Sequence, residues 1–79
     1  MKREARKVFN QLKKLGCPVK EWHYDDRGYF WISAEEESSP EWLDYWSNYE
    51  GSELLNEILN KNGFYWEWHN PGYGCVYDI

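Results

Sequence analysis

The sequence predicts an α+β fold in which helices cover one face of a four-stranded antiparallel sheet. Two segments have the three- and four-residue spacing of apolar positions that is typical of amphipathic helices. Each is followed by a glycine and then by residues rich in aromatic and β-branched side chains, which favour β-hairpins. We therefore predict the element order αββ-α(α)-ββ in a single domain, residues 1–79.

The composition predicts that this short chain is folded. Its 79 residues are near the lower limit for a domain that folds alone. Six tryptophans, seven tyrosines and three phenylalanines are present, and each aromatic side chain can bury roughly 150–250 Å². A disordered acidic chain would hold far fewer of them.

Residues 3–15 predict the first helix, with Lys and Arg on its polar faces. Gly16 is placed to end it, and Pro18 prevents its continuation. Its apolar stripe consists of Ala5, Val8, Phe9, Leu12 and Leu15.

Residues 19–34 predict the first hairpin, with a turn at 25–28 in which Gly28 adopts a positive φ. Alternation places Phe30 and Ile32 on the core face of the second strand. It places Tyr29 and Trp31 on the opposite face.

The middle of the chain predicts either two consecutive helices or one long helix, and the sequence favours two. Ser39 is expected to be the N-cap of the first helix, followed by Pro40 and a helix that continues to Tyr49. Gly51 and Ser52 break or kink the helix, and Ser52 then caps a helix over residues 53–62. The second apolar stripe consists of Leu54, Leu55, Ile58 and Leu59.

Residues 64–79 predict the second hairpin, with a turn at 70–74. Phe64, Trp66 and Trp68 alternate onto one face. The tripeptide Glu-Trp-His occurs in both hairpins, at 21–23 and 67–69. The repeat suggests an internal αββ duplication, with chance similarity as the open alternative.

The charge is divided unevenly along the chain. Residues 1–20 carry seven bases and one acid, whereas residues 25–57 carry ten carboxylates and one base, Arg27. The acidic part repels nucleic acid and anionic lipid and attracts basic protein surfaces. No apolar run long enough for a membrane span and no signal-peptide pattern is visible. We therefore expect a cytoplasmic protein with a basic protein partner, no direct nucleic-acid contact and no membrane contact.

The acidic segment is the leading candidate for a partner-binding site, with a merely solvated face as the alternative. In its sharpest form, the carboxylates imitate a nucleic-acid backbone, which carries one charge per about 1.7 Å of duplex axis. Such a protein would block the basic site of a nuclease or another DNA-handling or defence complex, as inhibitors encoded by phages and mobile elements do. The candidate residues are the acids Glu35, Glu36, Glu37, Glu41, Asp44, Glu50, Glu53 and Glu57 and the aromatic anchors Trp31, Trp42, Tyr45 and Trp46.

Two other functions remain open. Glu21, His23, Glu67 and His69 could hold a divalent metal or a small ligand if their strands were neighbours, although such residues are ordinary on a solvated sheet face. A homodimer could also form through the aromatics of the open sheet face.

Nothing in the sequence indicates an enzyme or a cofactor. Cys17 and Cys75 have no adjacent histidine, and neither a nucleophile elbow nor a phosphate-binding loop is present. We expect both cysteines to be buried thiols, with a disulfide between them as the open alternative.

Overall fold

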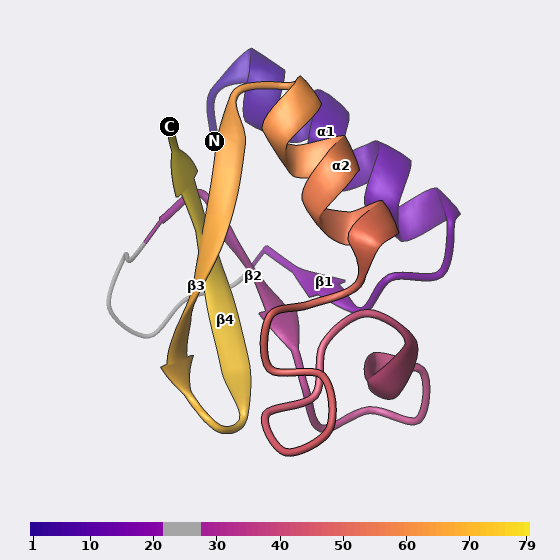
Figure 1. Cartoon of the computed structure of the whole chain (residues 1–79). Helices are drawn as coiled ribbons and strands as arrows, with labels where there is room; N and C mark the ends of the chain where they lie inside the picture. Colours follow the sequence, from indigo (N-terminus) through magenta and orange to yellow (C-terminus); the bar gives the residue numbers. More distant parts are fainter. Residues whose placement is uncertain (22–27) are drawn as a thin grey trace.

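The computed structural model describes residues 1–21 and 28–79 of the chain. The four strands form one antiparallel sheet in the order β1-β2-β4-β3 (Figure 1). The predicted α+β class is therefore confirmed. The elements are α1 (Arg3–Lys14), β1 (Val19–Lys20), β2 (Phe30–Ser33), the 3₁₀ helix η1 (Ser39–Glu41), α2 (Glu53–Lys61), β3 (Phe64–Asn70) and β4 (Tyr73–Asp78).

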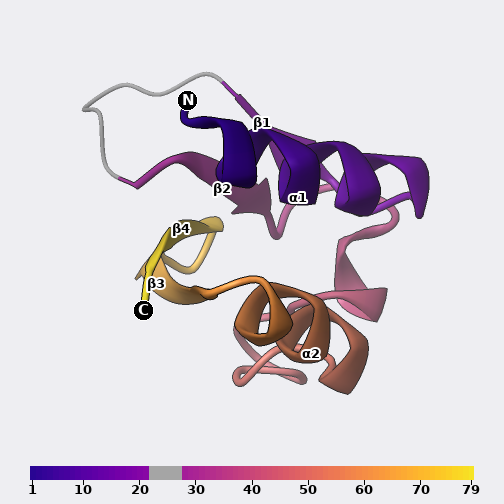
Figure 2. The same cartoon turned by 90° about the horizontal axis from the view of Figure 1, so that it is seen from above.

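The core lies between the two helices and one face of the sheet (Figure 2). Phe30 and Ile32 of β2 are fully buried, so their predicted core orientation is confirmed. The Phe9 ring of α1 meets the Phe30 ring edge-on, with centroids 5.3 Å apart. From α2, the buried side chains are Leu55, Ile58 and Leu59.

The strand order is symmetric about the central β2–β4 pair. Phe30 faces Val76 and Ile32 faces Gly74 across this pair, while β1 and β3 form the two edges of the sheet. An internal αββ duplication would give this arrangement, although the duplication itself stays a prediction.

Gly28 allows the chain to enter β2 close to the backbone of β4. Its φ is 70°, which confirms the predicted positive φ. A Cβ atom at this position would lie 2.4 Å from the carbonyl oxygen of Val76. The rest of the predicted turn, residues 25–27, lies outside the described residues.

The predicted helix from Pro40 to Tyr49 is wrong, because only the single turn η1 forms. Beyond it, Asp44 and Asn48 exchange two backbone hydrogen bonds in an isolated bridge. The Asp44 side chain also accepts the N–H groups of Trp46 and Ser47, at 3.0 and 3.3 Å. These local bonds satisfy the backbone groups that a helix would otherwise use.

The predicted break before α2 is confirmed. Gly51 has a φ of 80°, which ends the irregular segment. The Ser52 hydroxyl accepts the N–H of Leu55 at 3.1 Å, as expected of an N-cap. Ser39, by contrast, is not the N-cap of η1; Ser38 occupies that position.

Four smaller predictions are also wrong. Leu15 and Leu54 are 51% and 49% exposed, because Leu15 lies past the end of α1 and Leu54 faces away from the core. Tyr29 packs against the core, with its ring 5.7 Å from that of Phe64. The second hairpin turn is shorter than predicted, because β4 already begins at Tyr73.

No helix in residues 1–21 and 28–79 is long and apolar enough to cross a membrane.

Candidate partner-binding surface

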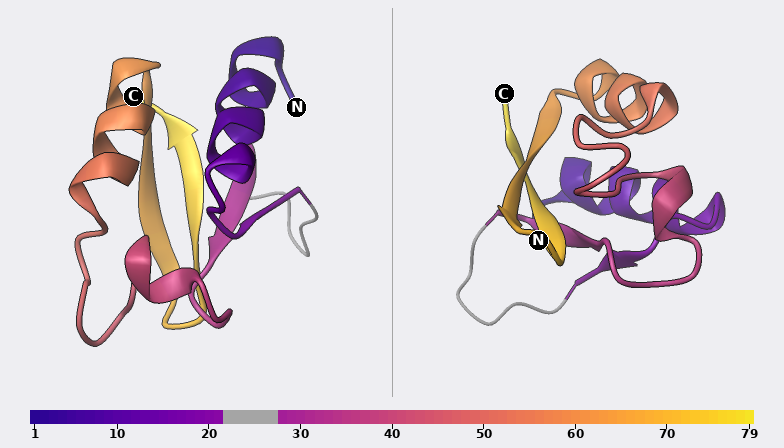
Figure 3. Two further views of the ribbon diagram at one scale, coloured as in Figure 1. Left: turned by 90° about the vertical axis from the view of Figure 1, so that its right-hand side faces the viewer. Right: turned by 60° about the horizontal axis from the view of Figure 1, so that its bottom comes forward.

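The loop of residues 42–51 connects η1 to α2 and is anchored by its first two side chains. Trp42 is only 5% exposed, and Leu43 is fully buried. The N–H of Ser52 donates to the Trp42 carbonyl at 2.8 Å, which closes the loop. Figure 3 shows the loop at the same end of the molecule as the β3–β4 turn. Trp42 is therefore part of the core, and its predicted role as an aromatic anchor for a partner is wrong.

The loop brings its aromatic side chains against β3. The ring centroid of Tyr45 lies 5.1 Å from that of Trp46 and 5.2 Å from those of Tyr49 and Trp68. The rings of Trp66 and Trp68 are 5.0 Å apart. We call these five residues the aromatic cluster. Its outer members are strongly exposed, Trp46 at 85% and Tyr49 at 55%.

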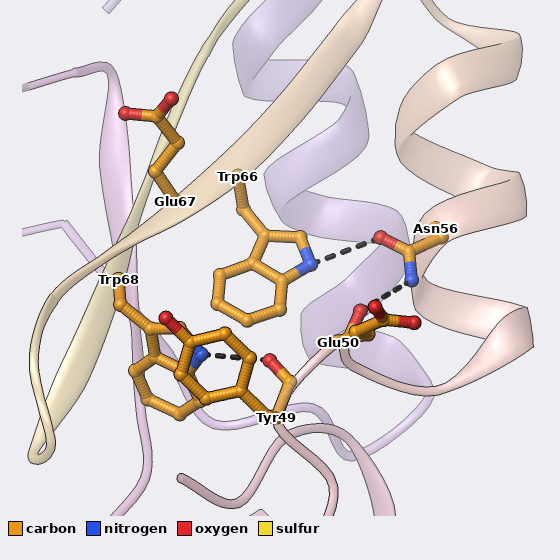
Figure 4. Close-up of a pocket in the computed structure, with 6 residues that line it drawn as sticks. All are labelled: Tyr49, Glu50, Asn56, Trp66, Glu67 and Trp68. Atoms are coloured by element: carbon orange, nitrogen blue, oxygen red, sulfur yellow. Dashed lines mark hydrogen bonds between the residues drawn. The ribbon is translucent and has the colours of Figure 1, made fainter.

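The two indoles of β3 are held in fixed positions. The Trp66 Nε1–H donates to the Asn56 side-chain oxygen at 2.9 Å, and the Trp68 Nε1–H donates to the Tyr49 carbonyl at 2.7 Å (Figure 4). Trp66 also lies between two glycines. A Cβ at Gly51 would come within 2.8 Å of the Trp66 ring, and one at Gly74 within 2.6 Å.

Two pockets are lined by members of the aromatic cluster. The first, which we call the indole pocket, has a volume of about 470 Å³ and is lined by Tyr49, Glu50, Asn56, Trp66, Glu67 and Trp68. The second has a volume of about 390 Å³, and its lining includes Glu35, Tyr45 and Trp46. Both pockets therefore combine aromatic rings with at least one acidic residue.

Most of the predicted acids lie on the surface. Seven of the eight are exposed, and Asp44 is half-buried. Glu36, Glu37 and Glu41 line a further open depression of about 560 Å³ beside η1. Among the described residues, the ion pair that joins a predicted acid to a base is Glu36–Lys20, at 2.7 Å. Within the described residues, the other exposed acids of this set form no ion pair with a base.

Ser39 holds the acidic turn before η1 in place. Its hydroxyl is fully buried, accepts the N–H of Glu36 at 3.0 Å and donates to the Ser33 carbonyl at 2.6 Å. The turn that carries Glu35, Glu36 and Glu37 is thereby tied to the end of β2.

Asp44 has a structural role within the loop. The N–H groups of Trp46 and Ser47 stabilise its carboxylate and lower its pKa below the ordinary value of 3.8. A lowered pKa means that the stabilisation is complete above pH 3.8 and is lost as the pH falls through the lower, folded value.

Acidification should therefore disturb the loop only at low pH. We expect the amide chemical shifts of Trp46 and Ser47, followed by NMR from pH 6 to pH 2, to titrate with a midpoint below 3.8. In Asp44→Asn, whose amide oxygen can accept the same bonds, this titration should disappear. A midpoint at or above 3.8 would contradict the assignment.

Trp31 does not belong to this surface. It alternates with Phe30 and Ile32 and so lies on the sheet face opposite the helices, where its ring is 4.9 Å from that of Tyr73. Of the four predicted aromatic anchors, the structure brings together only Tyr45 and Trp46.

The predicted metal site requires neighbouring strands, and this condition is not met. β1 and β3 form opposite edges of the sheet, with β2 and β4 between them. Glu21 pairs with Arg6, which lowers the pKa of its carboxyl, and the His69 ring stacks on Tyr73 at 4.8 Å. His23 lies outside the described residues. Among those that are described, no three His, Cys, Asp or Glu side chains gather as a metal site would require.

The two cysteines are both buried thiols, as predicted. Burial raises the pKa of Cys17 to about 12, which keeps this thiol protonated and unreactive.

Three members of the aromatic cluster were missed as site residues. Tyr49 falls in the predicted helix, and Trp66 and Trp68 fall on one face of the predicted strand with Phe64. Their alternation was predicted, but not the fact that the 42–51 loop, instead of a helix, lies against them. An excess of aromatics on both segments was the available signal.

Comparisons of this chain with protein-family models, with curated proteins and with solved structures find no match.

Proposed function

We propose that this chain is a protein-binding module that attaches to a basic surface of its partner through the aromatic cluster and the acids around it. The observation that carries the proposal is Trp46, whose side chain is 85% exposed on a loop held by its own hydrogen bonds. Exposed apolar side chains gathered in one place often mark protein interfaces.

The physical chemistry of the cluster supports this use. Tryptophan and tyrosine dominate the binding energy of protein interfaces because they bury a large area. Ordering flexible side chains on binding costs about 0.5–1.5 kcal/mol each. That cost is reduced here, because Tyr45 contacts three neighbouring rings and Trp68 is hydrogen-bonded to the loop.

The charges favour a basic partner. Within the described part of the chain, no base of α1 forms an ion pair with the acids of residues 35–57. The base that pairs with Glu36 is Lys20, which belongs to β1. In its sharpest form, the proposal is that the acids occupy the nucleic-acid site of a nuclease or another DNA-handling or defence complex. The density of carboxylates on a small, rigid scaffold supports this form.

Charge reversal tests the proposal. Replacing Glu37, Glu41 and Glu53 together by lysine should abolish capture of a nucleic-acid-binding partner from lysate. The variant should also lose competition with the partner's own DNA. Any binding that purified partner still shows at low salt should depend less on the salt concentration, because fewer ion pairs form. Each substituted side chain is exposed, so the fold should persist.

Glu4→Lys, in the first turn of α1, is the matched control. Glu37→Lys and Glu4→Lys change the net charge equally, but Glu4 lies outside the acidic segment. We expect only Glu37→Lys to weaken binding to the captured partner. Unchanged affinity of the triple variant would exclude the proposal.

Two other functions remain as proposals with separate tests. A homodimer through the open sheet face, which holds Trp31 and Tyr65, would double the solution mass measured by light scattering. A metal-binding domain would show a thermal shift on adding Zn²⁺ to the purified chain. The positions of β1 and β3 at opposite edges do not support the metal-binding function.

A further inference from the structure

The indole pocket presents aromatic ring surfaces to its interior. The N–H groups of Trp66 and Trp68 are both used in hydrogen bonds within the protein, to Asn56 and to the Tyr49 carbonyl. The indoles therefore offer a ligand their ring atoms and not their N–H groups. The volume of about 470 Å³ lies within the range of ordinary ligand pockets.

One carboxylate accompanies these rings. Figure 4 shows Glu50 at the end of the pocket where Asn56 lies, while the carboxylate of Glu67 points away from both indoles. The Asn56 amide nitrogen is committed to the Glu50 and Ser52 carbonyls, at 2.8 and 3.2 Å. The Glu50 carboxylate is thus the charged group of the pocket.

No base of the described part of the chain occupies this pocket. Elsewhere in the described residues, the Lys2 ammonium lies over the Tyr29 and Phe64 rings, and Arg6 and Lys13 lie over the Phe9 ring. Rings and a carboxylate therefore form a cation site that the rest of the described protein does not fill.

We infer that the indole pocket binds the guanidinium group of an arginine side chain from the partner protein. A planar guanidinium stacks on tryptophan faces and pairs with a carboxylate through two parallel hydrogen bonds, which the compact ammonium of lysine cannot do. The Trp66 and Trp68 rings meet at 83°, so the guanidinium stacks on the face of one indole only, and Glu50 supplies the carboxylate. The inference rests on the proposed function, because it names the group by which a basic partner is recognised.

The pocket is suited to this role because it exists before binding. Trp66 is wedged between Gly51 and Gly74 and hydrogen-bonded to α2 through Asn56. Trp68 is hydrogen-bonded to the loop, with the Tyr45 and Tyr49 rings beside it. A guanidinium would enter without reordering these rings, which preserves affinity.

The test uses an arginine analogue and not the partner. N-acetyl-arginine methylamide is titrated into ¹⁵N-labelled full chain while the indole N–H resonances of Trp66 and Trp68 are followed. We expect saturable shifts with a Kd in the millimolar range. N-acetyl-citrulline methylamide, which has the same shape without the charge, should bind at least about tenfold more weakly, because charge-assisted bonds are roughly twice as strong as neutral ones.

Two variants with the same change in charge locate the site. Glu50→Gln should weaken binding of the arginine analogue about fivefold or more, whereas Glu4→Gln, on α1 and outside the pocket, should leave it unchanged. Absence of saturable shifts, equal binding of citrulline, or an unaffected Glu50→Gln variant would each overturn the inference. Preference for the corresponding lysine analogue would overturn the assignment to guanidinium.

The arginine-analogue titration and the charge-reversal test of the proposed function can fail independently of each other. The charge-reversal test changes Glu37, Glu41 and Glu53, none of which lines the indole pocket. If that test succeeds and the arginine analogue does not bind, the inference fails alone. If the analogue binds and charge reversal leaves partner binding unchanged, the proposed function fails alone.

Discussion

Trp46→Ala is expected to weaken partner binding at least about 30-fold, which corresponds to the roughly 2 kcal/mol or more of an interface hot spot. The same substitution should leave the thermal unfolding midpoint almost unchanged. The indole is 85% exposed, and the backbone of Trp46, not its side chain, donates the hydrogen bond to Asp44. Isothermal titration with the captured partner and calorimetric unfolding of the free chain provide the two measurements.

Leu54→Ala is the matched control for this prediction. Leu54 is another large apolar side chain, 49% exposed at the start of α2, but it does not belong to the aromatic cluster. Its truncation should affect neither binding nor stability by more than about 0.5 kcal/mol. Equal losses of affinity in both variants would mean that binding depends on exposed apolar surface in general and not on Trp46.

Gly74→Ala is expected to lower the free energy of unfolding by about 3 kcal/mol, the upper end for overpacking a core. The new methyl group would lie 2.6 Å from the Trp66 ring and 3.1 Å from the Glu67 carbonyl oxygen. The ring cannot move aside, because Gly51 lies against its other edge. Urea unfolding of the purified variant measures the loss.

Gly72→Ala provides the comparison within the same hairpin. Its methyl group would also meet a neighbour at 2.4 Å, but that neighbour is the carboxylate end of Glu35, an exposed and flexible side chain. The cost should stay within about 0.5 kcal/mol, as for an ordinary surface substitution. If both glycine variants unfold at the same urea concentration, Trp66 is not confined in the way described.

Local patterns were sufficient to predict most of the elements. The spacing of apolar residues located α1 and α2, and Ser52 was recognised as a cap because its chemistry is local. The alternation of Phe64, Trp66 and Trp68 along β3 was likewise readable, since side chains of a strand alternate between faces. These features depend on neighbours within a few residues.

The 42–51 loop could not be predicted in the same way. Trp42, Tyr45, Trp46 and Tyr49 have helical spacing, but the bonds of Asp44 to the backbone compete with a helix and form instead. Trp42 and Trp46 look equivalent in the sequence, yet one is 5% and the other 85% exposed. Only packing against the sheet distinguishes them.

The sequence predicted only part of the candidate site, because the rest depends on packing between segments that are distant in the chain. Sequence indicates the sign and the number of the charges, and the acids at 35–37 are indeed on the surface. Which aromatics accompany them depends on strand order and on the path of the loop. The order β1-β2-β4-β3 separates the two Glu-Trp-His segments, and the loop joins Tyr45 and Tyr49 to Trp68.

Hydrogen–deuterium exchange of the full chain, with and without its captured partner, tests the central claim most directly. The claim is that the aromatic cluster and the acids around it form the binding surface. We predict that the partner slows amide exchange in residues 44–51 and 66–68 and leaves α1 unchanged. Slower exchange confined to α1, or to the outer sheet face around Trp31 and Tyr65, would contradict the claim.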